Sequence, residues 1–352
     1  LDTEEIRVDD QVVPLETDIT TPLAYRLNNS SLWTIGERRF LTGAEVPLRL
    51  LLIQPYEQGR IPVVFVHGTA SSPVWWAEMV NFLRADPEIR KQFQFWFYQY
   101  NSSNLITLSA AELREGLTAM VDQLDPLHKD PALQKMVVIG HSQGGLLTKM
   151  TAVNSGNDLW NAISDEPIEK MQLNPEMEKF VRRLLFFEAL PFVTRVVFIS
   201  TPHRGSYLTK GWVRSLVRTV ISLPSNIFNE DSWKSMSARF KLPQSVQGEI
   251  PTSIDGMSAE NPLLKGLVAL PLAPGITAHS IIAVKPDMEI AEGNDGVVAY
   301  ESAHIEGVES EFIVRAGHSC QDHPFVIEEV RRILLKHIGI EANQQALSVQ
   351  KQ

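Results

Sequence analysis

The sequence predicts an α/β protein in which a mostly parallel sheet is covered by helices on both faces. Short apolar segments rich in β-branched and aromatic residues alternate along the chain with segments that have helical periodicity. Several of these short segments, such as 61–67, are continuously apolar, which is typical of strands buried on both faces. Strands that alternate with helices in this way imply parallel pairing with helices above and below the sheet.

The first half of the chain supplies four strands and three helices. Residues 1–30 are acidic, rich in Thr and Pro and without helical periodicity, so we expect an extended arm there. The predicted strands cover residues 46–54, 61–67, 93–100 and 135–140. The predicted helices cover residues 71–83, 108–124 and 144–153. The apolar face expected for the first helix consists of Trp75, Trp76, Met79, Val80 and Leu83.

The second half continues the alternation and then interrupts it. A strand is predicted at 193–200, after a stretch, 155–190, that is longer than a normal connection between helix and strand. Regular alternation stops after Thr201 for about seventy residues. It returns with strands at 277–284 and 311–315 and a closing helix at 324–337. We therefore divide the chain into four units. Residues 1–45 form an N-terminal arm with the first edge structure, 46–204 and 276–340 the core, 205–275 a cap insertion and 341–352 a tail.

Composition excludes several classes of protein. With 44% hydrophobic and 21% charged residues the 352-residue chain is typical of a globular protein, and the net charge of −10 disfavours a nucleic-acid partner. Cys320 is the single cysteine, so no disulfide forms within the chain. No apolar run reaches the roughly 18–20 residues of a transmembrane helix, so we expect no integral membrane segment. Because the chain begins at Leu1 rather than Met, we favour an exported or lipid-anchored location over the cytoplasm.

The segment Gly140-His141-Ser142-Gln143-Gly144 matches the pattern G-x-S-x-G. It follows a predicted strand and precedes a predicted helix, and this context favours a tight turn that lifts the serine hydroxyl clear of the sheet. Glycine fits two residues before and two residues after the serine because the backbone passes closely there. The alternative without a catalytic role is a Gly-rich loop between strand and helix in which Ser142 is simply buried.

Two backbone N–H groups are candidates to stabilise a negatively charged oxygen. The N–H of Gln143 lies at the start of a helix next to Ser142. The N–H of Thr69 follows the strand end at His67-Gly68, where glycine permits a sharp turn. For His67 itself we favour a structural role that braces this loop.

A serine nucleophile needs a base and a group that orients the base. His318 follows the last strand directly, so it lies at the sheet edge where Ser142 is expected, and His323 is the alternative. His203 precedes the acid candidates and is interpreted as structural. Asp295, in a Gly-flanked turn after the strand at 277–284, is the preferred acid. The competing acids are Asp287, Glu289 and Glu292.

These motifs resemble those of the α/β-hydrolase superfamily, and within it of bacterial serine esterases and lipases with a His-Gly oxyanion loop. The matching segments span about 60–337 and are His67-Gly68-Thr69, Gly140 to Gly145, Thr201 to Ser206, Asp295 to Val298 and Gly317-His318. The resemblance implies that Ser142 is the nucleophile, His318 the base and Asp295 its orienting acid. It also implies that Thr69 and Gln143 donate to the oxyanion.

The insertion contains the clearest amphipathic helix, predicted at 210–223. We expect its apolar residues Trp212, Leu216 and Val220 to wall an acyl pocket, with packing onto the core as the alternative.

The sequence as a whole predicts hydrolysis of a small-molecule, lipid or polymeric carboxylic ester through an acyl-enzyme. It predicts no cofactor and no metal site. The alternatives are an acyltransferase or thioesterase with the same three residues, and a non-catalytic binding module on the same scaffold. The oligomeric state is left unpredicted.

Overall fold

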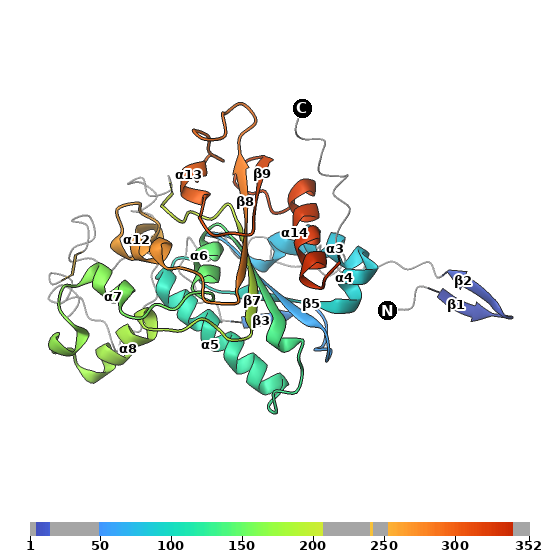
Figure 1. Ribbon diagram of the computed structural model, residues 1–352, viewed down its shortest axis with the longest axis horizontal. Helices are drawn as coiled ribbons and strands as arrows, with labels where there is room; N and C mark the ends of the chain where they lie inside the picture. The colour runs from blue at the N-terminus through green and yellow to red at the C-terminus, as the bar shows by residue number, and fades with distance from the viewer. Residues whose placement is uncertain (1–4, 15–48, 207–239, 242–252, 341–352) are drawn as a thin grey trace.

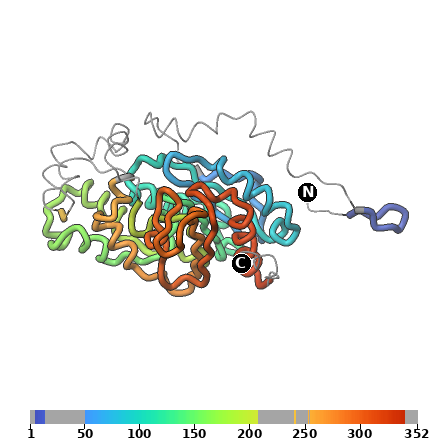
Figure 2. The backbone as a smooth tube through the Cα atoms, turned by 90° about the horizontal axis from the view of Figure 1, so that it is seen from above, coloured from blue at the N-terminus to red at the C-terminus, as the bar shows by residue number. Residues whose placement is uncertain are grey.

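The computed structural model describes residues 5–14, 49–206, 240–241 and 253–340. At its start, β1 (Glu5–Val8) and β2 (Gln11–Pro14) pair as an antiparallel hairpin whose described side chains are exposed. Asp9 and Asp10 join the strands with φ of 47° and 62°, the positive values that both central residues of a type I′ hairpin turn adopt. Figure 2 shows this hairpin set apart from the rest of the described chain.

The main sheet has seven strands in the order β3-β5-β4-β6-β7-β8-β9. Their bounds are β3 Arg49–Leu52, β4 Ile61–Val66, β5 Phe93–Gln99, β6 Met136–His141, β7 Val193–Ile199, β8 Thr277–Val284 and β9 Ser310–Arg315. The edge strand β3 is antiparallel to β5, and every other neighbouring pair is parallel. This arrangement confirms the fold class that the sequence predicts.

Successive residues of the central strands point to opposite faces of the sheet and into two separate cores. In β4, Val64 and Val66 belong to one core, while Val63 and Phe65 belong to the other. The first core is closed by α5 (Ile106–Leu124) and α6 (Gln143–Lys149). The second is closed by α3 (Ala77–Ala85), α4 (Pro87–Gln92) and α14 (Pro324–His337), on the other side of the sheet in Figure 1.

The helix predicted at 71–83 begins differently from our expectation. Pro73–Trp76 form a 3₁₀ turn, η1, and α3 follows it. Trp76, Met79, Val80 and Leu83 are buried as predicted, with the spacing i, i+3, i+4, i+7 of one helix face. Trp75 is 38% exposed, so its placement on the buried face was wrong. It precedes this stripe by one residue and turns away from the core.

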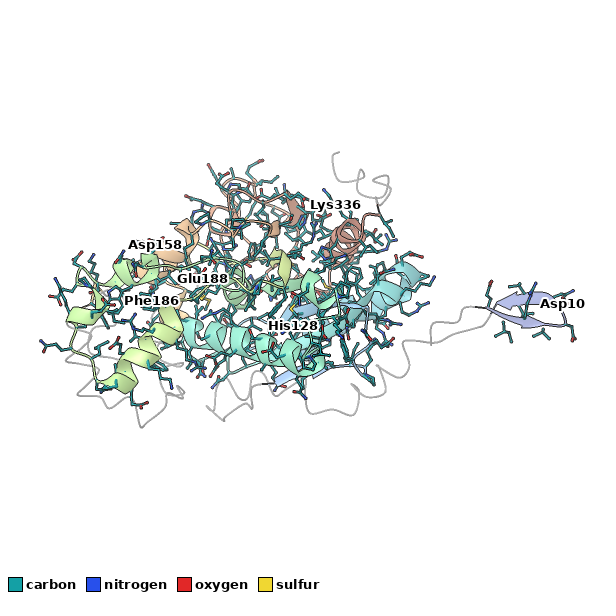
Figure 3. The ribbon with its side chains drawn as sticks, turned by 60° about the horizontal axis from the view of Figure 1, so that its bottom comes forward. Asp10, His128, Asp158, Phe186, Glu188 and Lys336 are labelled. Atoms are coloured by element: carbon teal, nitrogen blue, oxygen red, sulfur yellow. The ribbon has the colours of Figure 1, made fainter. Side chains whose placement is uncertain are left out.

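The long stretch at 155–190 contains helices that the sequence analysis did not identify. They are α7 (Asp158–Ile163), a 3₁₀ turn η3 (Ile168–Lys170) and α8 (Pro175–Leu185). The Asn174 side chain caps α8 by accepting from Met177 N, and Pro175 occupies its first turn. Asp158 of α7 and Phe186, just after α8, lie at the same end of the molecule, away from Lys336 of α14 (Figure 3).

Part of the predicted cap insertion is described. It includes α11 (Ser253–Gly256) and α12 (Pro262–Ala269), and α12 packs on α7. The buried Lys149 Nζ donates to Val268 O at 3.0 Å, which ties α6 to α12. The start of the insertion contacts the residue after α11, because Ser206 N donates to Met257 O at 3.0 Å. The amphipathic segment predicted at 210–223 lies outside the described residues.

Candidate active site

Ser142 lies on the turn between β6 and α6. Its φ of 54° and ψ of −127° are unusual for a residue with a side chain, so the turn is strained. The turn is fixed by Ser142 N, which donates to Ile199 O of β7 at 2.9 Å, and by Gly145 N, which donates to Ser142 O at 2.9 Å. The neighbouring strand and the start of the helix therefore hold the serine in a single position.

The glycines on either side of Ser142 are required by close packing. A Cβ on Gly140 would lie 2.4 Å from Gly144 O, and a Cβ on Gly144 would lie 2.2 Å from Val66 O. No larger residue fits at either position without moving the backbone. This is the close approach that the sequence pattern predicts.

The structure brings three of the predicted residues together in one hydrogen-bonded series. His318, in the loop between β9 and α14, has its Nε2 2.8 Å from Ser142 Oγ. Its Nδ1 lies 2.7 Å from Asp295 Oδ2. Nδ1–H donates to the carboxylate, which leaves Nε2 to accept the serine proton. The imidazole side chain is 16% exposed and the Asp295 side chain 1% exposed, so the series runs from a buried acid towards solvent.

Asp295 is held in a tight turn after β8. Its Oδ1 accepts from Val297 N at 2.8 Å and from Val298 N at 2.7 Å, which leaves Oδ2 for His318. The turn is closed by a bridge between Asn294 and Ala299, and α13 (Tyr300–Ala303) follows. The competing acids have exposed side chains; they are Asp287, Glu289 and Glu292.

The strained Ser142 lies on a strand-to-helix turn at the edge of a mostly parallel sheet. An acid and then a histidine follow it along the chain, and the three side chains form one hydrogen-bonded series. The chain has the α/β-hydrolase fold. In this α/β-hydrolase fold the loops after β4, β6, β8 and β9 meet at one sheet edge, because parallel strands end together.

Comparisons with known proteins give likenesses of fold. No family model and no curated protein matches the chain. Among solved structures it is similar to a Bacillus licheniformis lipase in mature form, with 15% identity over 84% of this chain and 98% of that chain and a TM-score of 0.47. It is also similar to a thermophilic esterase from Thermogutta terrifontis, with 14% identity, 86% and 94% coverage and a TM-score of 0.41. A lipase-esterase related protein from Clostridium acetobutylicum gives 12% identity, 83% and 100% coverage and a TM-score of 0.41.

The loop after β4 runs directly against the turn that carries Ser142, which we call the elbow. A Cβ on Gly68 would lie 2.9 Å from Ser142 Cβ, so only glycine permits this approach. The Thr69 side chain donates from Oγ1 to Gln143 Oε1 at 2.6 Å, which joins the two residues whose N–H groups were predicted as oxyanion donors. Gln143 is the first residue of α6, so its N–H has no acceptor within the helix.

His67 braces the same loop. Its ring stacks on Tyr100 with centroids 4.4 Å apart, and Tyr100 Oη donates to His67 O at 2.8 Å. Complete burial lowers the pKa of His67 to about 4, so the ring is neutral at ordinary pH. Its Nδ1 lies 2.9 Å from Gly68 O.

The two alternative histidines lie elsewhere. His323 accepts from Phe325 N at 3.3 Å and begins α14. His203 is buried, its ring packs edge-on to Phe198 at 4.8 Å, and burial holds its pKa well below the usual range. Neither ring nitrogen of His203 has a partner among the described residues.

His141 contacts the loop that carries His318. In the sequence analysis it was only a variable residue of the G-x-S-x-G pattern. Its Nε2 lies 2.9 Å from His318 O, and the two rings are 5.0 Å apart. Burial and, secondly, the nearby His318 lower the pKa of His141 to about 3. The neutral ring therefore donates Nε2–H to that carbonyl. No periodicity or spacing in the sequence signals this contact.

The remaining predicted site residues, Trp212, Leu216 and Val220, lie outside the described residues. Within the described residues, no group of three or more His, Cys, Asp and Glu side chains is arranged to hold a metal ion. The helices of the same residues are all too short or too polar to cross a membrane.

Proposed function

We propose that this protein is a serine hydrolase that cleaves carboxylic esters through an acyl-enzyme on Ser142. The observation that carries the proposal is the series Ser142 Oγ, His318 and Asp295, with distances of 2.8 Å and 2.7 Å. The series stands beside a loop and a helix start that offer two backbone N–H groups. This geometry suits a reaction in which a hydroxyl attacks a carbonyl and the carbonyl oxygen becomes negative.

Acylation begins when His318 Nε2 takes the Ser142 proton as Oγ attacks the ester carbonyl. The N–H groups of Thr69 and Gln143 stabilise the oxyanion of the tetrahedral intermediate. The intermediate collapses when the bond to the alcohol oxygen breaks, and the imidazolium gives its proton to that oxygen. Asp295 stabilises the imidazolium and keeps Nδ1 protonated.

Deacylation repeats these steps with water. His318 takes a proton from the water molecule as the water oxygen attacks the acyl carbon. The second tetrahedral intermediate then breaks its bond to Ser142 Oγ, which regains the proton from His318, and the free acid leaves. An alcohol that replaced water at this step would give transesterification. Added acceptor alcohols therefore separate a hydrolase from an acyltransferase by their products.

The apolar segment around Trp212, Leu216 and Val220 remains a proposed wall of the acyl pocket, and 205–275 a proposed cap. Activity measured on p-nitrophenyl esters of increasing acyl length tests this proposal. A pocket with apolar walls should raise kcat/KM with each methylene until it is full, because each buried methylene gains up to about 0.8 kcal/mol.

The test of the function compares four proteins on p-nitrophenyl butanoate: wild type, Ser142→Ala, His318→Ala and His323→Ala. The first two variants should lose about 10³-fold or more in kcat, since such residues act as a unit. His323→Ala is the matched control and should keep most activity, because its side chain caps α14. Labelling of wild type by a fluorophosphonate, and none of Ser142→Ala, would identify the nucleophile. Near-normal turnover in Ser142→Ala would remove the proposal.

A further inference from the structure

We propose that this site includes a polar subsite beside the oxyanion loop, formed by Asn101, Gln143 and Ser253, which binds an oxygen acceptor on the substrate. The inference rests on the proposed ester hydrolysis and narrows its substrate class. The substrates are esters that carry a neutral oxygen function, such as a hydroxyl, keto or ether oxygen, a few bonds from the scissile carbonyl.

The first observation is a set of buried donors without partners. Asn101 is 6% exposed, while Gln143 and Ser253 are 0% exposed. Among the described residues, Asn101 Nδ2, Gln143 Nε2 and Ser253 Oγ have no hydrogen-bond partner. Buried polar groups are normally paired, and an unpaired one is costly, so three such donors in one region need an explanation.

Turning either amide around would not pair these atoms. Gln143 Oε1 accepts from Thr69 Oγ1, so exchanging the amide oxygen and nitrogen would leave Oε1 unpartnered instead. Asn101 Oδ1 accepts from Ser103 N at 3.1 Å and Ser103 Oγ at 2.7 Å, which fixes its Nδ2 on the other side of the amide. Both amides therefore keep a free polar atom.

The second observation is that the segments bearing these donors are joined in a closed circuit of contacts. Thr69 joins Gln143, and Ala70 N donates to Ser102 Oγ at 3.0 Å. The circuit continues from the 101–104 turn to α11, because Ser253 N donates to Ser103 O at 3.2 Å.

The circuit closes through α11. Met257 N donates to Ser253 O at 3.1 Å, and Met257 Sδ lies 4.0 Å from Thr69 Oγ1. The turn that carries Ser142, the turn after β5 and the segment of α11 are thus each linked to the loop that carries Thr69 and Ala70. In the proposed complex, a substrate whose carbonyl oxygen accepts from Thr69 N–H places its next few bonds beside these segments.

The chemistry of the donors selects the ligand. Two amide N–H groups and a hydroxyl donate to an uncharged oxygen without needing a counter-charge. Asp255, buried in the same short helix, makes these surroundings unfavourable for a second carboxylate. A plain alkyl chain would leave the donors unpaired, so a substrate that pairs them is preferred.

The experiment uses two matched pairs of esters. The acyl pair is p-nitrophenyl butanoate and p-nitrophenyl 3-hydroxybutanoate, and the alcohol pair is ethyl butanoate and 2-hydroxyethyl butanoate. Wild type should prefer the oxygen-bearing member of one pair by about tenfold in kcat/KM, the usual worth of one or two hydrogen bonds. A preference in the acyl pair places the acceptor on the acyl chain, and one in the alcohol pair places it on the alcohol.

Ser253→Ala tests the subsite itself. It should abolish the preference and leave kcat/KM for the plain ester unchanged, because the hydroxyl has no other partner among the described residues. Ser109→Ala is the matched control. Ser109 is equally buried and its hydroxyl equally unpartnered there, but it lies on α5 outside the circuit, so the preference should persist.

Equal rates on both members of both pairs in wild type would overturn the subsite. So would a Ser253→Ala protein that loses the same factor on plain and oxygen-bearing esters, together with a lower melting temperature, since the hydroxyl would then be structural. Failure of the proposed function looks different: no ester is hydrolysed and no fluorophosphonate labels Ser142.

Discussion

His141 offers a sharp test of how the turn at Ser142 positions His318, the proposed base. Replacement by leucine removes the Nε2–H that donates to His318 O at 2.9 Å but keeps an apolar side chain of similar volume. The carbonyl retains its second donor, Cys320 N at 3.0 Å, so one of two hydrogen bonds is lost. The net worth of such a bond is about 0.5–1.5 kcal/mol. If the lost hydrogen bond stabilises the transition state by this amount, kcat drops by up to about tenfold.

The expected signature is a lower kcat with an unchanged KM on p-nitrophenyl butanoate, because the contact positions His318 and reaches no substrate. His141→Gln should recover most of the activity, since its amide N–H can donate to the same carbonyl. Its neutral side chain matches the histidine, whose pKa of about 3 keeps it uncharged at the assay pH. Equal losses in His141→Leu and His141→Gln, or unchanged kcat in His141→Leu, would refute a positioning role. Melting temperatures of both variants control for folding.

Asp295→Asn should lower kcat by about 10²–10⁴-fold, because an amide favours the wrong imidazole tautomer, while Asp287→Asn, with an exposed side chain, should match wild type. Gly144→Ala should abolish soluble folded protein, since its Cβ would lie 2.2 Å from a backbone oxygen. Gly116 lies in the middle of α5, and a Cβ there would be 3.7 Å from its nearest neighbour, so Gly116→Ala should raise the melting temperature. Burial lowers the pKa of Lys149 from 10.5 to about 7. Between pH 7 and pH 10.5 the unfolded chain therefore keeps a proton that the folded protein has released. The urea stability of wild type relative to Lys149→Met should therefore rise from pH 7 to pH 10, and a flat difference would contradict the burial argument.

The elbow was predictable because its constraints are local. The strand at 135–140, the spacing of the glycines and the helix that follows are all contained in one short segment. The approach of Asp295 and His318 to Ser142 was predictable for a different reason. The ends of parallel strands share one edge, so Asp295 and His318 had to approach Ser142 once the strand order was assumed.

Other parts could not be read from periodicity. The helix α7 has only six residues, too few to show a helical repeat, although Asn174-Pro175 was a usable start signal for α8. The contacts of His141 with His318, and of Ser253 with Ser103, join loops far apart in sequence. Hydrogen bonds between irregular loops leave no repeat in the sequence, so they emerge only from the folded structure.

The hydrogen bond between Ser206 N and Met257 O has an evolutionary consequence. A chain that leaves and re-enters the core at one point can change length between those points without altering the strands on either side. The entropy of closing such an excursion grows only with the logarithm of its length, by about 0.6 kcal/mol for each doubling. The length of the chain between Ser206 and Met257 can therefore change at little cost in loop-closure entropy, provided that Phe240, which packs edge-on to Trp160, and α11 are kept. Selection can vary this stretch while Ser142, Asp295 and His318, which lie outside it, keep their positions.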